Sequence, residues 1–300
     1  MPLRYWGLLL FLGAVWGGSF MFNAILIREI DPLWVSAGRV IIGASICWVY
    51  LLATRRKLPV EPMIYLQLLL LGIVNYAIPF ALFPYAEEHV PSGIVGVING
   101  LTPMSTVIVS QFWPGGEKAV WNKVAGVAIG FAGAVILASP SFAESGAAEI
   151  PALLAALAAT FCYAFSLNYA RRFRAIDSAS VATLSLTGAA IASTPFALTM
   201  AGAPVIALPE TWWALIGIGT LSTSFSMLLL YWLLPRVGAT NVALNTFITP
   251  ISALILGYFI LSESLMPVHF FGIAVIFLGL VAIDGRVLKL LRPRRPVIEG

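Results

Sequence analysis

The chain has 300 residues, of which 60% are hydrophobic and only 10% carry a charge. Soluble domains carry about 25% charged residues, so this composition excludes a soluble globular protein and indicates a polytopic membrane protein. The formal net charge of +4 does not indicate nucleic-acid binding, because the basic residues lie mostly in short segments between apolar runs, where they report topology.

Ten apolar runs follow one another along the chain, and each has about the 20 residues that a helix needs to cross roughly 30 Å of hydrocarbon. The first run is too long for the apolar core of a secretory signal, which has about 7–15 residues, so we expect a retained span. The connections are short and leave no room for a separate soluble domain. The expected spans are about 5–27, 33–53, 63–84, 91–113, 120–138, 151–170, 179–201, 211–234, 239–261 and 267–288.

The basic residues are confined almost entirely to alternate connections between spans. Fifteen of the 17 Lys and Arg residues lie in one set of connections, whereas the other set holds only Arg28, and Arg39 lies within a span. Because basic residues favour the cytoplasmic side, this pattern predicts a multi-pass protein of the bacterial inner membrane with both termini in the cytoplasm. The opposite connections carry acids, among them Glu87, Glu88, Glu144, Glu149 and Glu263.

Three pairs of stretches repeat with nearly the same separation of 145 to 147 residues. This period divides the chain into two five-span repeats, residues 1–145 and 146–300, the second with a basic cytoplasmic tail. Because five is an odd number, the repeats must have opposite orientations in the membrane. We therefore expect an all-α polytopic membrane protein with ten transmembrane helices in two inverted repeats, an arrangement typical of secondary transporters, with the substrate site where the halves meet. The matching stretches are "AVWGGSFMFN" (14–23) with "ATFCYAFSLN" (159–168), "NGLTPMS" (99–105) with "TFITPIS" (246–252), and "GVAIGFAGAVIL" (126–137) with "GIAVIFLGLVAI" (272–283).

Three short motifs accompany the repeats: "WGGSF" (16–20), "PLWVSAGRVIIGA" (32–44) and "LSESL" (261–265). With the ten spans, they resemble the drug/metabolite transporter superfamily, in particular its EamA-type exporters, which include the YddG-like exporters of aromatic amino acids. The resemblance implies a basket of helices around a central cavity lined mainly by spans 1, 3, 4, 6, 8 and 9, with spans 5 and 10 at the periphery. It also implies export of small metabolites, above all aromatic or other neutral amino acids, by alternating access. Ser185 stands where the first half has Arg39, so a role of that arginine is not duplicated.

Prolines inside the spans are candidate hinges. A proline within a helix removes one hydrogen bond and bends the helix, and Pro103 and Pro250 stand at matching places in the two repeats. Pro79 bends the third span together with Pro84, whereas the eighth span has no matching proline. Such bends are either hinges that help to form the site or static packing kinks, and we favour hinges.

Arg39 lies about 9 Å into the second span from its extracytoplasmic end, at 1.5 Å per residue. A charge at the centre of a span costs about 2.5–3.5 kcal/mol on insertion scales, and less near an interface. Three interpretations stay open: a gate ion pair with Asp31, Glu87 or Glu88, a contact with a substrate carboxylate, or snorkelling to lipid headgroups. We rank the gate ion pair ahead of direct substrate contact.

Aromatic and amide side chains recur in the spans that the resemblance places around the cavity. An amide in lipid is costly unless it finds a partner, so most of them should face inward. Aromatic faces with amide groups suit a flat, amphiphilic or zwitterionic small molecule. In the first span, Gly13 and Gly17 allow another helix to approach closely, which leaves Trp16 to face the cavity. The predicted cavity residues are Trp16, Asn23, Asn75, Tyr76, Asn99, Phe161, Tyr163, Asn168 and Asn245.

Two competing functions, an intramembrane enzyme and a channel, find little support in the residues. His89 and His269 lie at span ends without metal-binding spacing, no acidic pair lies at mid-depth, and no filter-like loop is evident. We therefore expect no catalytic activity, no cofactor and no metal. The expected partners are a small-molecule substrate and the lipid bilayer, with a homo-oligomer left open. Proton coupling and facilitated diffusion are both open, and Glu87, Glu88 and His89 are the candidate titrating cluster.

Overall fold

Prolines mark the starts of several helices in the computed structural model, which describes residues 2–140 and 149–284. Proline suits the first helical turn, where its missing N–H would have no partner, and Pro32, Pro62, Pro209 and Pro267 each open a helix. The main helices are α1 (Leu3–Leu26), α2 (Pro32–Ala53), α3 (Pro62–Gly72), α4 (Ile78–Glu87), α5 (Ser92–Asn99), α6 (Thr102–Phe112), α7 (Trp121–Leu137), α9 (Glu149–Tyr169), α10 (Ser178–Ala201), α11 (Pro209–Gly219), α12 (Ser226–Val237), α13 (Ala239–Val242), α14 (Asn245–Leu261) and α15 (Pro267–Asp284).

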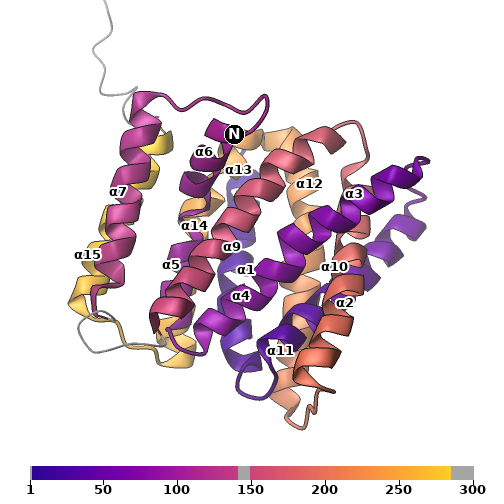
Figure 1. Ribbon diagram of the computed structural model, residues 1–300, viewed down its shortest axis with the longest axis horizontal. Coiled ribbons are helices and arrows are strands. Elements are labelled where there is room, and N and C mark those ends of the chain that lie inside the picture. Colours follow the sequence, from indigo (N-terminus) through magenta and orange to yellow (C-terminus); the bar gives the residue numbers. More distant parts are fainter. Residues whose placement is uncertain (1, 141–148, 285–300) are drawn as a thin grey trace, which may run out of the picture.

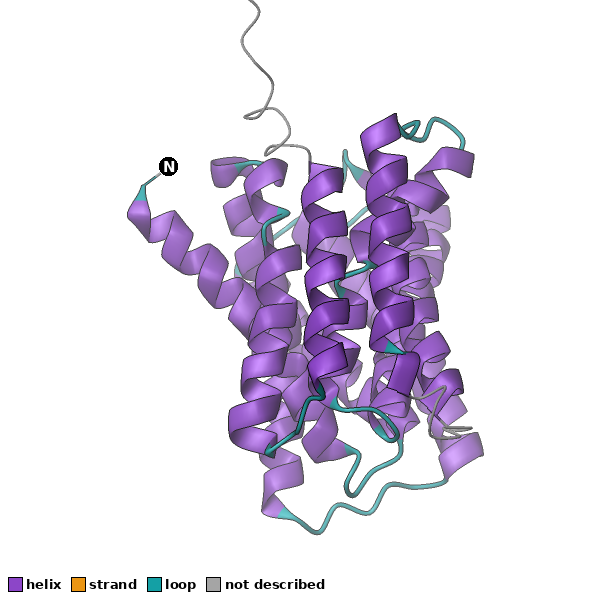
Figure 2. Ribbon diagram, turned by 90° about the vertical axis from the view of Figure 1, so that its left-hand side faces the viewer, coloured by secondary structure: helices purple, strands orange, loops and turns teal. Residues whose placement is uncertain are grey.

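The described residues form an all-helical bundle without a strand, and their helices correspond to the ten expected spans (Figure 2). Eight of the ten spans are long and apolar enough to cross a membrane, several of them made of two consecutive helices. The other two, α7 and α14, are shorter apolar helices. The fold class is thus confirmed. The basic tail, the repeat boundary near residue 145 and Glu144 lie outside the described residues.

The third and eighth spans share a wider helical turn at the same relative position. A π-helical segment, η1 (Ile73–Ala77), joins α3 to α4, and another, η3 (Thr220–Phe225), joins α11 to α12. In the third span, Pro79 has no N–H to offer the carbonyl four residues earlier. In the eighth span the hydroxyls of Thr223 and Ser224 donate to the carbonyls of Ile218 and Gly219, five residues earlier. The two spans therefore reach the same geometry by different chemistry, and only the third has a proline directly after its π-helical segment.

The fourth and ninth spans are both interrupted, but not at equivalent residues. In the fourth span, α5 ends at Asn99 and Pro103 stands in the first turn of α6. The Thr102 hydroxyl donates to the Asn99 carbonyl, which the proline leaves without its helical partner, over 2.7 Å. In the ninth span the break falls between α13 and α14, and Pro250 lies inside α14. The matched positions of Pro103 and Pro250 in the sequence thus do not give matched bends.

The two halves of the chain interlock rather than stand side by side (Figure 1). Helix α1 packs on α14, and α9, at the corresponding place in the second half, packs on α5 and α6. In the same way α2 packs on α11 and η3, while α10 packs on α3 and η1. Gly219 lets its helix approach Ile42 of α2, and Gly72 lets its helix approach the backbone of Ser185 in α10. This crosswise pairing is what two inverted repeats with a shared axis require.

The pair α7 and α15 lies at one side of the bundle (Figure 1). Here two helices touch through their backbones: a Cβ on Gly126 would lie 2.8 Å from the carbonyl oxygen of Gly279, and a Cβ on Gly133 would lie 2.9 Å from that of Gly272. In a membrane the hydrophobic effect does not drive helices together, because lipid is as apolar as their side chains. Glycine faces of this kind let the helices approach closely and pack tightly. Spans 5 and 10 therefore form a tight pair at the periphery.

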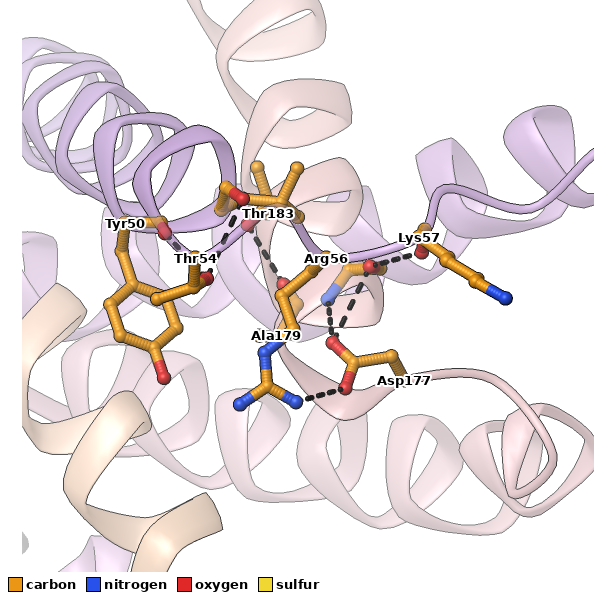
Figure 3. A network of polar contacts seen from close by, with 9 residues as sticks. Tyr50, Thr54, Arg56, Lys57, Asp177, Ala179 and Thr183 are labelled. Atoms are coloured by element: carbon orange, nitrogen blue, oxygen red, sulfur yellow. Dashed lines mark hydrogen bonds and ion pairs between the residues drawn. The ribbon is translucent and has the colours of Figure 1, made fainter.

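A polar network ties the end of α2 to the start of α10 (Figure 3). Arg56 forms an ion pair of 3.1 Å with Asp177, and the Ser180 hydroxyl donates to the Lys57 carbonyl over 2.9 Å. Asp177 also accepts a hydrogen bond from the backbone N–H of Ser180 and so caps α10. These contacts hold the second span of each half together at one end of the bundle.

The acidic residue of the "LSESL" motif joins the ninth span to the fourth. The Glu263 carboxylate accepts hydrogen bonds from the backbone N–H groups of Ser92, over 2.7 Å, and Gly93, over 3.0 Å. These groups open α5, where free N–H groups and the helix dipole favour a negative charge. A side chain on Gly257 would overlap the carboxylate, so this glycine makes room for the cap.

We expect Glu263→Ala to lower the free energy of unfolding by about 1 kcal/mol, because the substitution removes a helix cap. Thermal unfolding of the purified protein in detergent measures this effect. Glu61→Ala is the matched control, since Glu61 precedes α3 and its side chain makes no cap hydrogen bond. Equal stability losses in the two variants would contradict the capping role.

Candidate functional site

Arg39 lies at the centre of a polar and aromatic site inside the bundle. Its side chain comes from α2 and is buried, with 6% of the residue exposed. Nε donates to the Thr223 hydroxyl of η3 over 2.8 Å, and Nη2 donates to the Ser19 hydroxyl of α1 over 3.3 Å. The guanidinium carbon lies 3.6 Å from the ring centre of Phe80 in α4, a cation–π contact. Arg39 therefore contacts elements of both halves of the chain.

No carboxylate of the described residues lies within ion-pair distance of Arg39. Glu87 is near enough to act on the charge of Arg39, but it hydrogen-bonds Asn23 instead. Asp31 accepts the backbone N–H of Leu33 over 2.8 Å and caps α2. The predicted ion pair of Arg39 with Asp31, Glu87 or Glu88 is thus absent from this conformation, and its burial rules out snorkelling to headgroups here. What remains is a buried cation held by neutral groups.

Glu88 lies next to the site in sequence but is exposed. Partial burial raises the pKa of its carboxyl above the ordinary value; the nearby His89 opposes this shift and the negative charge of Asp31 adds to it. The neighbouring carboxyls of Glu87 and Glu88 therefore occupy different environments, one inside the bundle and one at its surface.

Aromatic rings form a continuous layer beside Arg39. Tyr76 and Phe80 have ring centres 5.6 Å apart, Phe83 and Tyr163 are 6.0 Å apart, and Phe20 meets Phe83 edge to face at 5.5 Å. The rings come from α1, η1, α4 and α9. Aromatic pairs in this distance range contribute specific geometry as well as buried area, so the rings form a packed apolar layer next to the cation.

The structure brings together some of the predicted cavity residues and separates others. Asn23, Tyr76 and Tyr163 lie around Arg39 or its neighbour Glu87. Asn168 instead lies in the interface of α9 with α6, where it accepts from the Ser110 hydroxyl over 3.0 Å and donates to the carbonyl of Ala164. Both ends of the Asn168 amide are thus used for helix packing.

Asn245 and Trp16 lie elsewhere on α1 and its neighbours. The Asn245 side chain faces Gly13 across the α1–α14 contact and donates to the carbonyl of Val242 over 3.1 Å. Trp16 is half-buried and packs against a cluster between α1 and α12 that includes Leu12. Asn75, Asn99 and Phe161 are half-buried within their spans. Cavity roles for these residues stay predictions.

Sequence reasoning missed the residues that hold Arg39 in place. Ser19 lies in the "WGGSF" motif but was not named as a site residue, and Phe80 and Thr223 were not named either. A signal was available in the hydroxyl-rich run "TLSTSF" (220–225), which directly follows Gly219 just as η1 follows Gly72. π-helical segments frequently occur at functional sites, so this shared feature would have pointed to the elements that surround Arg39.

A separate groove of about 470 Å³ lies between α2 and α10. Its lining is largely apolar and includes Trp48, Ile191 and Leu198, and none of the predicted cavity residues contributes to it. A small pocket of about 70 Å³ lies between α6 and the charged side chains of Glu117, Lys123 and Arg171. Neither feature includes Arg39.

Comparison with known proteins agrees with this architecture. The sequence model of the EamA-like transporter family matches residues 4–139 and 150–283. The uncharacterized inner membrane transporter YedA of Escherichia coli K12 is 25% identical over 99% of this chain and 95% of its own length. The uncharacterized transporter YoaV of Bacillus subtilis is 22% identical over 84% of this chain and 86% of its own length.

A solved structure shares the fold. One crystal structure superposes on this chain with a TM-score of 0.67 and 19% sequence identity. The match covers 97% of this chain and all of the other chain. At this identity the likeness concerns the fold alone. The family match, by contrast, covers nearly the whole sequence in two consecutive segments. The chain therefore belongs to the EamA-like transporter family and is a multi-pass membrane transporter.

Proposed function

We propose that the protein is a secondary transporter that exports small carboxylate-bearing metabolites, most of all aromatic or other neutral amino acids, by alternating access. The observation that carries the proposal is Arg39, a buried cation with neutral hydrogen-bond partners and no carboxylate in ion-pair distance among the described residues. Removing a charge from water is costly unless it is paired. A substrate carboxylate would supply the missing partner through charge-assisted hydrogen bonds.

The aromatic layer supports the amino-acid assignment. Phe80 lies against Arg39 and Tyr76 lies against Phe80, whereas Tyr163 acts on the charge of Arg39 and meets Phe83. Such rings accept a flat apolar side chain, and their faces also attract an ammonium group. A carboxylate at Arg39 with an apolar or aromatic group against these rings matches the two parts of a neutral amino acid.

Unequal packing of the two halves supports alternating access. Helix α4 packs closely on α9, whereas α12, at the corresponding place in the second half, packs only lightly on α1. Two inverted repeats, residues 1–145 and 146–300, that hold unlike shapes can exchange those shapes, and this exchange opens the site alternately to each side. The distribution of basic residues supports an orientation with both termini in the cytoplasm, in which the closely packed end faces outward.

Counterflow in proteoliposomes tests this function. Vesicles loaded with an unlabelled amino acid should accumulate the same labelled amino acid transiently, and phenylalanine, tryptophan and leucine cover the proposed range. Protein-free vesicles and vesicles with the Arg39→Met variant are the controls. Absence of counterflow with every neutral amino acid would refute the substrate class.

A further inference from the structure

Glu87 is a buried carboxyl at the end of α4, with 9% of the residue exposed. Its Oε1 accepts a hydrogen bond of 3.2 Å from Nδ2 of Asn23, which lies on α1 and is 2% exposed. The second carboxyl oxygen of Glu87, Oε2, and the amide oxygen of Asn23, Oδ1, are both buried without a hydrogen-bond partner. Two facing side chains are therefore joined by one hydrogen bond and leave one acceptor each unused.

These two unused atoms are complementary once a single proton is added. A buried acceptor without a partner costs about 1–3 kcal/mol, and more when it is charged. An ionised carboxylate can only accept, whereas a protonated carboxyl also donates one O–H. A proton on Oε2 of Glu87 can be donated to Oδ1 of Asn23, while Oε1 continues to accept from Nδ2. The pair then forms a closed ring of two hydrogen bonds with no unused buried atom.

We propose that Glu87 and Asn23 form a proton-binding site that couples transport to the proton gradient. The inference rests on the proposed transport function and adds its driving ion. The site joins α1 to α4 next to Ala86, which belongs to the same buried cluster as Ala156 and Ala159 of α9. A bound proton stabilises this closed arrangement, because it satisfies both side chains. Loss of the proton leaves an ionised carboxylate in a dry interface and favours opening of this end to water.

The groups around Glu87 fit a site that exchanges a proton. Arg39 from α2 attracts a negative charge on Glu87, and Glu263, from the segment after α14, repels it. Tyr163 from α9 meets Phe83, which lies one turn before Glu87. Arg39 makes its direct contacts with Ser19, Thr223 and Phe80 instead, so it does not hold Glu87 in the ionised form.

Infrared spectroscopy of the purified protein tests proton binding without any transport. Spectra at about pH 6, where an ordinary glutamate is ionised, should show a protonated carboxyl band. Glu87→Gln should remove this band. It should also fold normally, because the glutamine amide can donate to Oδ1 of Asn23. Glu88→Gln, at the exposed neighbour, should leave the band unchanged. A band that survives in Glu87→Gln, or no protonated carboxyl in the parent protein, would overturn the proposal.

Flux measurements then separate this inference from the transport function itself. A proton gradient should drive net substrate movement in the parent protein and in Glu88→Gln, but not in Glu87→Gln, which should retain exchange of labelled for unlabelled substrate. Flux that ignores the gradient in the parent protein would refute the coupling and leave transport standing. Loss of all flux with the infrared result intact would refute the substrate assignment and leave the proton site standing.

Discussion

Gly17→Ala is expected to disrupt the contact of α1 with α14, whereas Gly18→Ala, one residue further, leaves stability unchanged or slightly raised. A Cβ at Gly17 would overlap the Ser252 hydroxyl and lie 2.7 Å from the Thr249 carbonyl and 2.8 Å from the Ala253 nitrogen. Two of these atoms belong to the backbone and cannot rotate away, so α14 itself must move. Added methyl groups in a tight interface cost about 1–3 kcal/mol.

The adjacent glycine is a strict control for this effect. A Cβ at Gly18 would meet only Leu256, at 3.7 Å, which is ordinary van der Waals contact. Alanine is favoured over glycine in a helix by about 1 kcal/mol. Both variants gain this helix propensity, but in Gly17→Ala the clash with α14 outweighs the gain. Thermal unfolding in detergent and the yield of monodisperse protein measure the difference. Equal stabilities of the two variants would show that the α1–α14 contact is loose.

Arg39→Met is expected to weaken substrate transport strongly while leaving the protein as stable as before or more stable. Buried charges contribute little to stability, because the cost of removing them from water opposes their favourable interactions. Replacing such a charge by a well-packed apolar side chain of similar volume therefore often leaves the free energy of unfolding unchanged or higher. The substrate carboxylate, however, loses charge-assisted hydrogen bonds of about 1.5–3 kcal/mol. This corresponds to a roughly ten- to hundredfold weaker affinity, measured as the substrate concentration that gives half-maximal counterflow.

Two further variants identify the cause of that loss. Arg39→Lys keeps the charge but not the planar group that donates to Thr223 and Ser19 while covering Phe80, so we expect it to be impaired as well. Arg28→Met makes the same chemical change as Arg39→Met at an exposed position and should transport normally. If Arg39→Met lowers the melting temperature as much as it lowers flux, the arginine has a structural role instead.

Apolar runs predicted the spans well, because a membrane imposes the length of every helix and the sequence must meet it. Gly126 and Gly133 match Gly272 and Gly279 in the sequence repeat, but the direct contact of these four residues between α7 and α15 was not predicted. Bends were harder to predict. Proline is the residue that predicts a bend, but the π-helical segment of the eighth span contains hydroxyl residues and no proline. Pro250 lies inside a helix, whereas Pro103 lies in the first turn of one.

The site was predicted only in part, for a physical reason. Amide side chains in a membrane need partners, but a partner can be the substrate, a neighbouring helix or the side chain's own backbone. Asn168 finds Ser110 and Ala164, whereas Asn23 finds Glu87. Spacing along one helix cannot tell these cases apart, because the choice depends on which other helix lies opposite. Arg39 stood out in the sequence since charges within spans are rare, yet its neutral partners did not.

The glycine contact between α7 and α15 also sets an order of events while the chain is being made. Helix α7 lies within the first half of the chain, and its partner α15 ends the described part of the sequence. Until α15 arrives, the face of α7 that holds Gly126 and Gly133 has no backbone to pack against. A chain cut short before α15 would therefore leave this glycine face without its partner backbone.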